Sequence, residues 1–460
     1  MVRNVPRILL AGTGSGCGKT TVVCGILQAV VNRGIRTGAF KCGPDYIDPM
    51  FHSRIIGAKS SNLDPFFFDQ NTLRLLLAEN AEDCAVSIIE GAMGYYDGAG
   101  LATSRASSWE TASLTNTPAV LVVPAKGAAM SVLAVIQGFL DFQTESKICG
   151  VILNRCTAMT YQGLAEEIKR RFAGKVEPLG FLPEVPECTL ESRHLGLVTA
   201  AEVEDLREKM QVLAQYVEKY ICVNELLRLA SEAPELEYCP IVWERREPVR
   251  IAVARDKAFC FYYEDSLRML EKLGGELVEF SPLSDSALPE GIHGLYLGGG
   301  YPELYTEALS QNNSMRRSVR QALQNGLPCI AECGGFMYLA EQIAQWPMVG
   351  FLPGKCWDNH KLTRFGYVVL KAETDNVLCR KGEEIRGHEF HHWDTEQPGE
   401  AFTAAKPSGR FWRCAYASDR FYAGYPHFHF YANPRFAENF YDACIKEKHH
   451  YAGNSETYGH

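Results

Sequence analysis

A glycine-rich turn between an apolar run and a helical pattern constrains the fold of this 460-residue chain more than any other feature. The apolar run Ile8–Ala11 leads into Gly12–Gly18, and Lys19, Thr20 and Thr21 open the helical pattern. Glycines let backbone N–H groups curl around phosphate oxygens, and the positive end of the following helix adds to the attraction. Strand, glycine turn and helix in this order predict a phosphate loop in a parallel α/β sheet.

The phosphate loop supplies the candidate ATP contacts. Lys19 is expected to reach the β- and γ-phosphates, and Thr20 to ligate magnesium. The chain has glycine at Gly12 and threonine at Thr13, one place off the strict pattern, and this form resembles dethiobiotin synthetase and its relatives. By analogy with that enzyme, Asn154 is a candidate adenine contact, and the absence of an Asn-Lys-x-Asp signature there favours ATP over GTP. The predicted ATP-binding residues are Thr13, Gly14, Ser15, Gly16, Cys17, Gly18, Lys19, Thr20, Thr21 and Asn154.

The apolar periodicity predicts two α/β domains, the first a doubly wound one. Apolar runs that suit buried parallel strands alternate with helical patterns before a proline-containing stretch, and the alternation then resumes. We therefore expect an ATP-binding domain at 1–227, a linker at 228–248, a second α/β domain at 249–445 and a loose polar tail at 446–460. The expected strands are Arg7–Ala11, Ala85–Ile89, Ala119–Val123, Gly150–Leu153, Val249–Ala254, Leu277–Phe280, Gly294–Leu297 and Pro328–Ala331. The expected helices are Thr20–Asn32, Asn71–Ala81, Tyr263–Leu273 and Gly335–Ala344.

Charge and cysteine usage exclude several classes of protein. The net charge is −9 and no basic block stands out, which argues against a nucleic-acid partner. None of the 16 cysteines forms a Cys-x-x-Cys pair, so neither a zinc site nor a disulfide scaffold is expected. No stretch approaches the ~20 apolar residues of a membrane span, and Ile8–Ala11 is too short for a signal peptide. A soluble, cytoplasmic protein is expected.

Carboxylates gather where two segments of the first domain end. Asp45 and Asp48 lie three apart in a segment that Gly43 and Pro49 keep out of a helix. Glu90 ends a run typical of a buried strand. An acid at the carboxyl end of a parallel strand beside a phosphate loop suits magnesium or a substrate.

A cysteine in the second domain carries the signature of a nucleophile. Small residues around Cys333 permit a sharp turn from strand to helix that would present its sulfur, and a helix N-terminus would lower the pKa of the thiol. The base must be close in space only. His427 and His429, in a strand-like alternation, are the candidates, with His427 preferred.

The segment 388–392 matches His-Glu-x-x-His, the signature of zinc proteases. That chemistry needs two histidines one helical turn apart. Gly387 before the match, aromatic residues within it and Trp393 after it favour a strand or a turn. We therefore predict no zinc site there.

Taken together, the motifs resemble the cobyrinate a,c-diamide synthase family, which includes hydrogenobyrinate and nickel-sirohydrochlorin a,c-diamide synthases. The resemblance covers nearly the whole chain and rests on 14–20, 43–49 with His52, 62–64 and 90–98. It implies that Asp45, Asp48, Glu90 and Asp97 hold magnesium and position an acyl phosphate, with Thr20, Asp45 and Glu90 as metal ligands. The residues that it implies for substrate and acyl phosphate are Lys41, Asp45, Tyr46, Ile47, Asp48, His52, Asn62, Asp64 and Asp97.

The second domain resembles the class I glutamine amidotransferases. In that group a cysteine elbow is activated by a late histidine, here His427, and many members carry glutamate two residues later, where this chain has His429. His429 is thus an alternative base or an orienting group. The resemblance also implies an oxyanion loop at Gly299 and Gly300 together with Gly334.

The resemblance implies a ligase that uses ATP, Mg²⁺ and L-glutamine to amidate the a and c acetate carboxylates of a corrinoid in cobalamin biosynthesis. Cobyrinic acid is the preferred substrate, with hydrogenobyrinic acid and nickel-sirohydrochlorin as alternatives. A polycarboxylate substrate needs a locally basic pocket, to which Lys41, Arg54 and Arg193 with His194 are candidate contributors. The alternatives are a cobyric acid synthase and, from another class, a regulatory ATPase with an inert amidotransferase-like domain. A homodimer is the default expectation.

Overall fold

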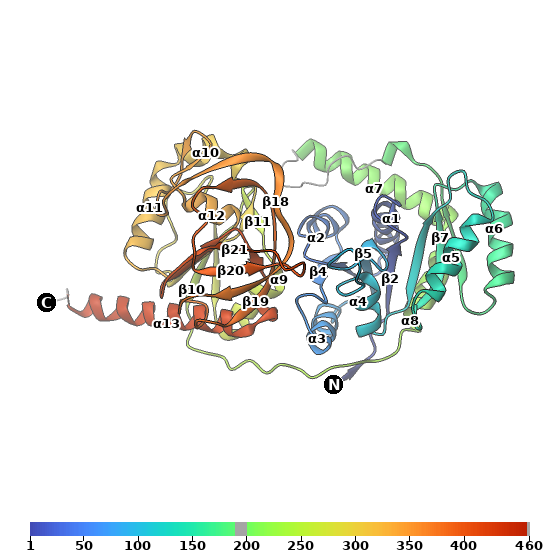
Figure 1. Ribbon diagram of the computed structural model, residues 1–460, viewed down its shortest axis with the longest axis horizontal. Coiled ribbons are helices and arrows are strands. Elements are labelled where there is room, and N and C mark those ends of the chain that lie inside the picture. Colours follow the sequence, from blue (N-terminus) through green and yellow to red (C-terminus); the bar gives the residue numbers. More distant parts are fainter. Residues whose placement is uncertain (189–199, 458–460) are drawn as a thin grey trace. The chain divides into compact units, whose positions relative to one another are not determined.

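The computed structural model describes residues 1–188 and 200–457, so Arg193 and His194 lie outside the described residues. The chain divides into two compact units, Met1–Pro240 and Ile241–His460 (Figure 1). Among the described helices, none is both long and apolar enough to cross a membrane.

A seven-stranded sheet in the order β4-β3-β5-β2-β6-β7-β8 forms the centre of the N-terminal unit. Every neighbouring pair of these strands is parallel, so all their carboxyl ends meet at one edge. Most of the strand residues are buried, and β2 and β6 at the centre are largely apolar, as expected for a sheet covered on both faces. They are β2 (Arg7–Gly12), β3 (Thr37–Cys42), β4 (Lys59–Leu63), β5 (Val86–Gly94), β6 (Ala119–Pro124), β7 (Ile148–Asn154) and β8 (Glu177–Leu182).

Helices follow these strands and are started by local signals in the sequence. The Asp69 carboxylate accepts the N–H of Thr72 at the start of α3, and the Thr157 hydroxyl accepts that of Thr160 at the start of α6. The helices are α1 (Lys19–Asn32), α2 (Ile47–Phe51), α3 (Gln70–Asn80), α4 (Ser108–Leu114), α5 (Ser131–Asp141), α6 (Ala158–Arg171), α7 (Ala200–Tyr220) and α8 (Val223–Ser231), with a π-helix η1 (His52–Ile56) and a 3₁₀ turn η2 (Pro186–Cys188).

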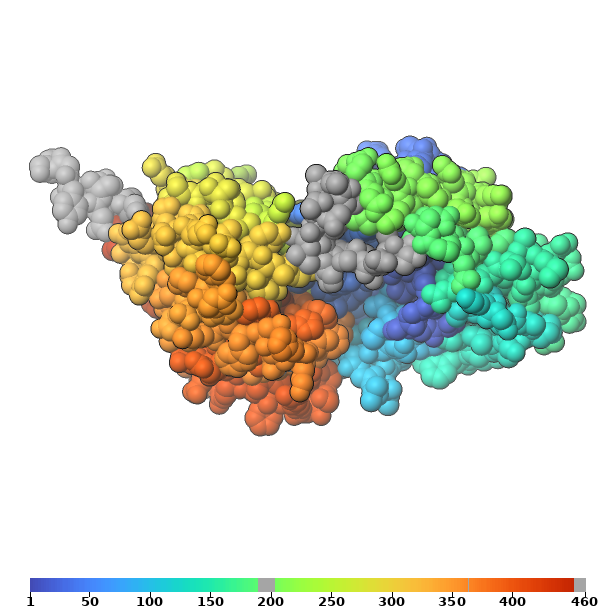
Figure 2. Space-filling model, turned by 90° about the horizontal axis from the view of Figure 1, so that it is seen from above, coloured from blue at the N-terminus to red at the C-terminus, as the bar shows by residue number. Residues whose placement is uncertain are grey.

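The last two helices complete the core of this unit. Leu213 and Val217 of α7 are buried against the apolar face of α1, and Figure 2 shows the green surface of α7 beside the blue N-terminal elements. In α8, Leu229 and Ala230 are also buried, which is why the helix continues to Ser231 and takes in the first four residues of the expected linker. A short pair of β1 (Val2–Arg3) with β9 (Leu236–Glu237) follows, so the unit extends to Pro240.

A second parallel sheet organises the C-terminal unit. Its order is β12-β10-β13-β15-β23-β22, in which only β22 is antiparallel to its neighbour. The strands are β10 (Arg250–Ala254), β12 (Glu276–Phe280), β13 (Gly294–Leu297), β15 (Cys329–Glu332), β22 (Tyr416–Ala417) and β23 (Phe421–Gly424). The expected strands of this domain therefore form one sheet.

The C-terminal unit also contains a mainly antiparallel sheet that the sequence pattern did not predict. A long hairpin of β18 and β19 is its centre, and bulges between Asp358 and Gly366 break the alternation of apolar and polar residues. Without that alternation the strand signal is lost. The strands are β16 (Gln342–Ile343), β17 (Trp346–Pro347), β18 (Lys355–Ala372), β19 (Glu384–Thr395), β20 (Phe402–Ala405), β21 (Phe411–Cys414) and β24 (His427–Phe428). A further pair is β11 (Phe259–Phe261) with β14 (Gly299–Gly300).

The helices of this unit differ from expectation at two ends. The helix expected over 335–344 ends at Leu339, because Ala340 is extended and Gln342–Ile343 joins the antiparallel sheet. The tail expected to be loose is helical to Thr457, and Lys446–Lys448 are residues that favour a helix. The helices are α9 (Glu264–Leu273), α10 (Thr306–Gln311), α11 (Asn313–Gln324), α12 (Gly334–Leu339) and α13 (Pro434–Thr457), with 3₁₀ turns η3 (Pro302–Leu304) and η4 (Phe430–Ala432).

Candidate functional site

The phosphate loop lies between β2 and α1, as predicted. Gly16 and Gly18 both have positive φ, at 75° and 82°, a conformation that glycine adopts without strain. Ser15 and Gly16 are exposed, so the loop is open to a ligand, whereas Lys19 is 9% exposed. The strand, turn and helix therefore form an anion-binding loop.

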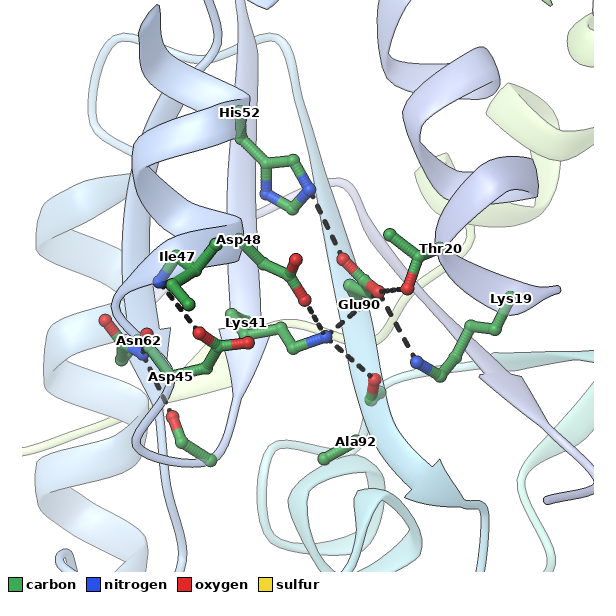
Figure 3. Close-up of polar contacts among 12 residues, drawn as sticks. Lys19, Thr20, Lys41, Asp45, Ile47, Asp48, His52, Asn62, Glu90 and Ala92 are labelled. Atoms are coloured by element: carbon green, nitrogen blue, oxygen red, sulfur yellow. Dashed lines mark hydrogen bonds and ion pairs between the residues drawn. The ribbon is translucent and has the colours of Figure 1, made fainter. Parts of the chain in front are cut away.

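Glu90 is the centre of a buried cluster of charges beside this loop (Figure 3). The strand register sets Lys41 of β3 next to Glu90 of β5, and their Nζ and Oε1 atoms are 2.9 Å apart. Lys19 Nζ lies 3.4 Å from the same oxygen, and the Thr20 hydroxyl donates to it at 2.7 Å. His52 Nε2, from the π-helical turn, is 3.3 Å from the other oxygen. Five predicted site residues thus meet around Glu90, within β5.

The charges in this cluster hold one another ionised. Burial alone would raise the pKa of Glu90, but Lys41, Lys19 and His52 keep that pKa well below its usual range. Burial alone would lower the pKa of Lys41, yet Glu90 and Asp48 raise it, and the Asp48 Oδ2 atom is 2.6 Å from Lys41 Nζ. The result is a preorganised pair of ammonium groups at the phosphate loop.

Asp45 lies in the loop before α2 and differs from Glu90 in its surroundings. Asp48 lies within α2, so the expectation that Gly43 and Pro49 keep both carboxylates out of a helix is wrong for Asp48. Pro49 stands in the first turn of that helix, where a proline is tolerated. The Oδ1 atom of Asp45 accepts the N–H of Ile47 at 2.8 Å, and Asn62 Nδ2 donates to the Asp45 backbone carbonyl at 2.8 Å. Burial and the neighbouring Asp48 raise the pKa of Asp45 to about 6. Asn62 therefore fixes the acidic loop from β4, which gives this predicted residue a positioning role.

The other predicted substrate residues are divided between core and surface. Tyr46 is 8% exposed and Asp64, which accepts the N–H of Phe66, is fully buried, so neither offers an open face. Ile47 is half-buried at the open edge. Asp97 is exposed and accepts the N–H of Gly94 at 2.8 Å, so one of its oxygens shapes the turn after β5.

The residues beside the phosphate loop suit a magnesium ion that also binds nucleotide phosphates. The Thr20 hydroxyl and the Glu90 carboxylate, 2.7 Å apart, are the oxygen donors that this ion prefers. Within residues 1–188 and 200–457, no three His, Cys, Asp or Glu side chains gather around a point where they could hold a metal by themselves. Thr20 and Glu90 thus fit the ion, with phosphate oxygens as the further ligands.

A cavity of about 590 Å³ opens beside the phosphate loop at the ends of β6, β7 and β8. Arg155, Thr157, Phe181 and Tyr220 are among its lining residues. The predicted adenine contact, Asn154, precedes this lining and donates to the carbonyl of Cys17 at 2.8 Å. Asn154 thus joins β7 to the phosphate loop at the rim of a space large enough for a nucleobase.

Cys333 occupies a sharp turn between β15 and α12. Its φ and ψ are 48° and −99°, outside the usual regions for a non-glycine residue, and such strain is typical of functional sites. Its N–H donates to Gly424 O at 2.7 Å, which ties the turn to β23. The nucleophile elbow predicted from the sequence is present.

The expectation of a lowered thiol pKa at Cys333 is wrong. Burial raises the pKa of the thiol, and the carboxylates of Glu303 and Glu389 raise it further. α12 spans only six residues, so its dipole offsets little of this effect. A base must therefore remove the proton when the substrate is bound.

His427 has the surroundings of such a base. It is 2% exposed, and its Nδ1 atom lies 3.1 Å from Oε2 of Glu332, the residue before the cysteine. His429 instead accepts the N–H of Tyr431 through Nδ1 and lies against the Tyr263 ring. Sequence reasoning missed Glu332, although the signal that selected Glu90, an acid that ends a buried strand, applies to it equally.

The predicted oxyanion loop lies against both groups. A Cβ atom on Gly299 would be 2.5 Å from Cε1 and 3.3 Å from Nε2 of His427. A Cβ atom on Gly334 would be 3.1 Å from the N atom of Gly300. The three glycines thus let the histidine, the loop and the elbow approach closely.

The His-Glu-x-x-His match lies within the strand β19, as predicted, so its histidines are not one helical turn apart. His391 Nε2 lies 3.0 Å from Glu389, whose other oxygen accepts the Trp412 indole N–H at 3.1 Å. His388 stacks on the His427 ring. The segment therefore forms a wall of the cysteine site.

Comparisons with known proteins agree with this division of the chain. A family model described as the CobQ/CobB/MinD/ParA nucleotide binding domain matches residues 8–198. Another, the CobB/CobQ-like glutamine amidotransferase domain, matches residues 250–435. Fold and sites thus define a protein in which a phosphate-loop domain is followed by a glutamine amidotransferase domain.

Curated relatives match over nearly the full length of the chain. A cobyrinate a,c-diamide synthase of Caldanaerobacter subterraneus subsp. tengcongensis is 40% identical over 444 residues, which is 95% of this chain and 98% of that protein. A cobyrinate a,c-diamide synthase of Clostridium acetobutylicum is 38% identical, over 94% of this chain and 99% of that protein. A cobyrinate a,c-diamide synthase of Priestia megaterium is 37% identical, over 96% of this chain and 98% of that protein. The chain belongs to the cobyrinate a,c-diamide synthase family.

Proposed function

We propose that this chain is a ligase that amidates the a and c acetate carboxylates of cobyrinic acid in cobalamin biosynthesis, with ATP and glutamine as co-substrates. The observation that carries the proposal is full-length membership of the cobyrinate a,c-diamide synthase family together with two intact sites. One site suits phosphoryl transfer, and the other suits the release of ammonia from an amide.

The C-terminal unit releases ammonia. Cys333 sulfur attacks the side-chain carbonyl carbon of glutamine, and His427 takes the thiol proton. His427 then gives a proton to the departing nitrogen. Ammonia is released, and a glutamyl thioester remains on Cys333. Water cleaves the thioester to glutamate and restores the thiol. Backbone N–H groups near Gly300 and Gly334 are suited to the oxyanion that forms on the carbonyl oxygen.

The N-terminal unit activates the acceptor. A carboxylate oxygen of the corrinoid attacks the γ-phosphorus of ATP, which yields an acyl phosphate and ADP, and ammonia then displaces phosphate to leave the amide. Lys19 and Lys41 stabilise the charge on the phosphoryl group during its transfer. Magnesium, held by Thr20 and Glu90, offsets the phosphate charge when it is bound. Asp45, also predicted as a ligand, stays a prediction.

The carboxyl edge of the sheet suits a polycarboxylate substrate. Lys41 is committed to Glu90 and Asp48, whereas Arg54 in the π-helical turn is exposed and available to a substrate carboxylate. Ile47, half-buried at the same edge, offers an apolar contact for the macrocycle. These groups would hold the corrinoid with an acetate arm near the phosphate loop.

The test of this proposal is mass spectrometry of macrocycles after incubation with ATP, magnesium and amide-¹⁵N glutamine. Cobyrinic acid, hydrogenobyrinic acid, nickel-sirohydrochlorin and a corrinoid that already carries the a and c amides are offered in parallel. Two labelled nitrogens on cobyrinic acid are expected. Two on another macrocycle would change the substrate and keep the reaction. Four on a corrinoid that already carries the a and c amides would indicate a cobyric acid synthase. ATP hydrolysis without any label would indicate a regulatory ATPase.

A further inference from the structure

The histidine of the cysteine site needs a group that fixes its orientation, and His429, predicted as an alternative base or an orienting group, makes other contacts. His429 stands two residues after His427, where many class I amidotransferases carry glutamate. Its Nδ1 atom accepts the N–H of Tyr431 at 3.2 Å, and its ring centroid is 4.7 Å from that of Tyr263. Its Nδ1 atom is therefore occupied as a cap of η4.

Glu332 has the contacts that such a group requires. Its side chain is 2% exposed, its Oε2 atom lies 3.1 Å from Nδ1 of His427, and its Oε1 atom accepts the Tyr296 hydroxyl at 2.8 Å. The strand register pairs Glu332 with Gly424, three residues before His427. Backbone pairing on one side and the tyrosine on the other thus fix the carboxylate.

We infer that Glu332 is the positioning carboxylate of the glutaminase site, which holds His427 in the tautomer that accepts the Cys333 proton. The inference rests on the proposed function. A carboxylate can only accept, so Nδ1 of His427 must carry the hydrogen and Nε2 is left as the acceptor. Nε2 is the ring nitrogen that faces the glycine loop, since a Cβ on Gly299 would lie 3.3 Å from it.

Glu332 also supplies the charge that the proton transfer requires. When His427 becomes an imidazolium it is buried, and a buried cation without a counter-charge is strongly disfavoured. The group stacked on its ring, His388, lies at a centroid distance of 5.1 Å, and burial lowers the pKa of His388 well below its usual value, so it is neutral. Glu332 is the carboxylate hydrogen-bonded to the His427 ring.

The strain at Cys333 explains how adjacent residues serve one histidine. Neighbouring side chains of a strand point to opposite faces. The φ of 48° at Cys333 breaks this alternation directly after Glu332, so β15 can present a carboxylate and a thiol in succession at the same end. The acid thus comes from the nucleophile strand, while the histidine comes from β24.

The test compares Glu332→Gln with Glu332→Asp, Tyr296→Phe and Glu447→Gln in the full chain. Glu447 of α13 is a matched control, because it is also a buried glutamate. Its Oε2 atom lies 3.0 Å from a guanidinium nitrogen of Arg420. Two quantities are measured: glutamine hydrolysis without acceptor, and the pH dependence of Cys333 alkylation by iodoacetamide, located by mass spectrometry. Alkylation reports the thiolate–imidazolium pair, which a merely structural role would not change.

Glu332→Gln is expected to lower kcat for hydrolysis by on the order of 10²–10⁴-fold with KM within about threefold, because an amide permits the wrong tautomer. The pH at which alkylation rises is expected to move upward. Glu332→Asp should have values of kcat and of the alkylation pH between those of the wild type and of Glu332→Gln. Tyr296→Phe should lower kcat and raise the alkylation pH by less than Glu332→Gln does. Glu447→Gln should change neither quantity.

Wild-type kcat and an unchanged alkylation profile in Glu332→Gln would overturn the inference. If that variant does not fold, an unchanged profile in both Glu332→Asp and Tyr296→Phe would overturn it equally. The proposed function fails separately, if the wild-type chain neither hydrolyses glutamine nor transfers its nitrogen.

Discussion

At the scale of single residues, two neighbouring histidines have different surroundings and should have different roles. His427 contacts Glu332 and faces the glycine loop, whereas His429 caps η4 beside Tyr263. His427 has Nε2 beside Gly299 of the glycine loop and Nδ1 beside the Glu332 carboxylate. We therefore expect His427 to be the base.

Substitution of each histidine by asparagine separates these roles. The asparagine Oδ1 atom can replace Nδ1 of His429 as the acceptor of the Tyr431 N–H, whereas an amide cannot act as the base at position 427. His427→Asn should lower glutamine hydrolysis by on the order of 10³-fold or more. His429→Asn should keep activity within about threefold and lower the melting temperature, since a buried ring is lost. Steady-state glutaminase assays and thermal melts check both. Equal losses of activity in the two variants would contradict the assignment.

The residue scale also shows what the sequence could predict. Cys333, Lys19 and Glu90 stand out because strand, turn and helix signals surround them. Glu332 has the same strand-end signal as Glu90, but its partner His427 follows 95 residues later, and only the tertiary pairing of β15 with β23 brings the two together. The thiol pKa of Cys333 could not be predicted, because Glu303 and Glu389 approach it from other elements.

At the scale of elements, the short strand β14 controls the position of the histidine. Gly299 leaves just the space that the His427 ring fills, since a Cβ there would meet Cε1 at 2.5 Å. Gly299→Ala must displace either the ring or the loop. A displacement of about 1 Å costs on the order of 10²-fold in rate when it misplaces a reacting group.

Gly299→Ala is therefore expected to lower kcat for glutamine hydrolysis by about 10–10²-fold while the chain still folds. Gly163→Ala is the control, because Gly163 lies inside α6 with open space at its Cβ position. That variant should keep full activity and be as stable or more stable, by about 0.5–1 kcal/mol. Steady-state kinetics and urea unfolding of both variants provide the comparison. Full activity in Gly299→Ala would show that β14 does not set the ring position.

Parallel strands were predictable as elements, and the antiparallel sheet was not. β2, β6 and β15 are short runs that are apolar except for Arg7 at the start of β2 and Glu332 at the end of β15, and they are bounded by glycine or proline, which is the pattern of buried parallel strands. β18 contains Asp358, Lys361 and Arg364 and is interrupted by bulges. Contacts with the neighbouring strand β19 stabilise β18, and the sequence of β18 alone does not reveal these contacts.

At the scale of the whole molecule, each unit contains the groups that we propose for one half of the reaction. The Lys41–Glu90 cluster consists only of N-terminal residues. The Glu332–His427 contact and the Cys333–Gly424 hydrogen bond involve only C-terminal ones. Ammonia is the one reactant that the first half must obtain from the second. Ammonia supplied from solution should therefore replace the C-terminal chemistry entirely.

Cys333→Ser is expected to abolish amidation driven by glutamine and to leave amidation driven by ammonium chloride at about pH 8.5 unchanged, since that pH supplies free ammonia. Lys41→Met should lower both by at least about 10²-fold, because it removes a cation from the phosphoryl site, while hydrolysis of glutamine without acceptor continues. Lys59→Met is the control, as Lys59 is exposed at the opposite end of the neighbouring strand. Loss of ammonia-driven amidation in Cys333→Ser would contradict the division of labour. The N-terminal unit receives its ammonia from solution in that assay, so it should not depend on the Cys333 thiol.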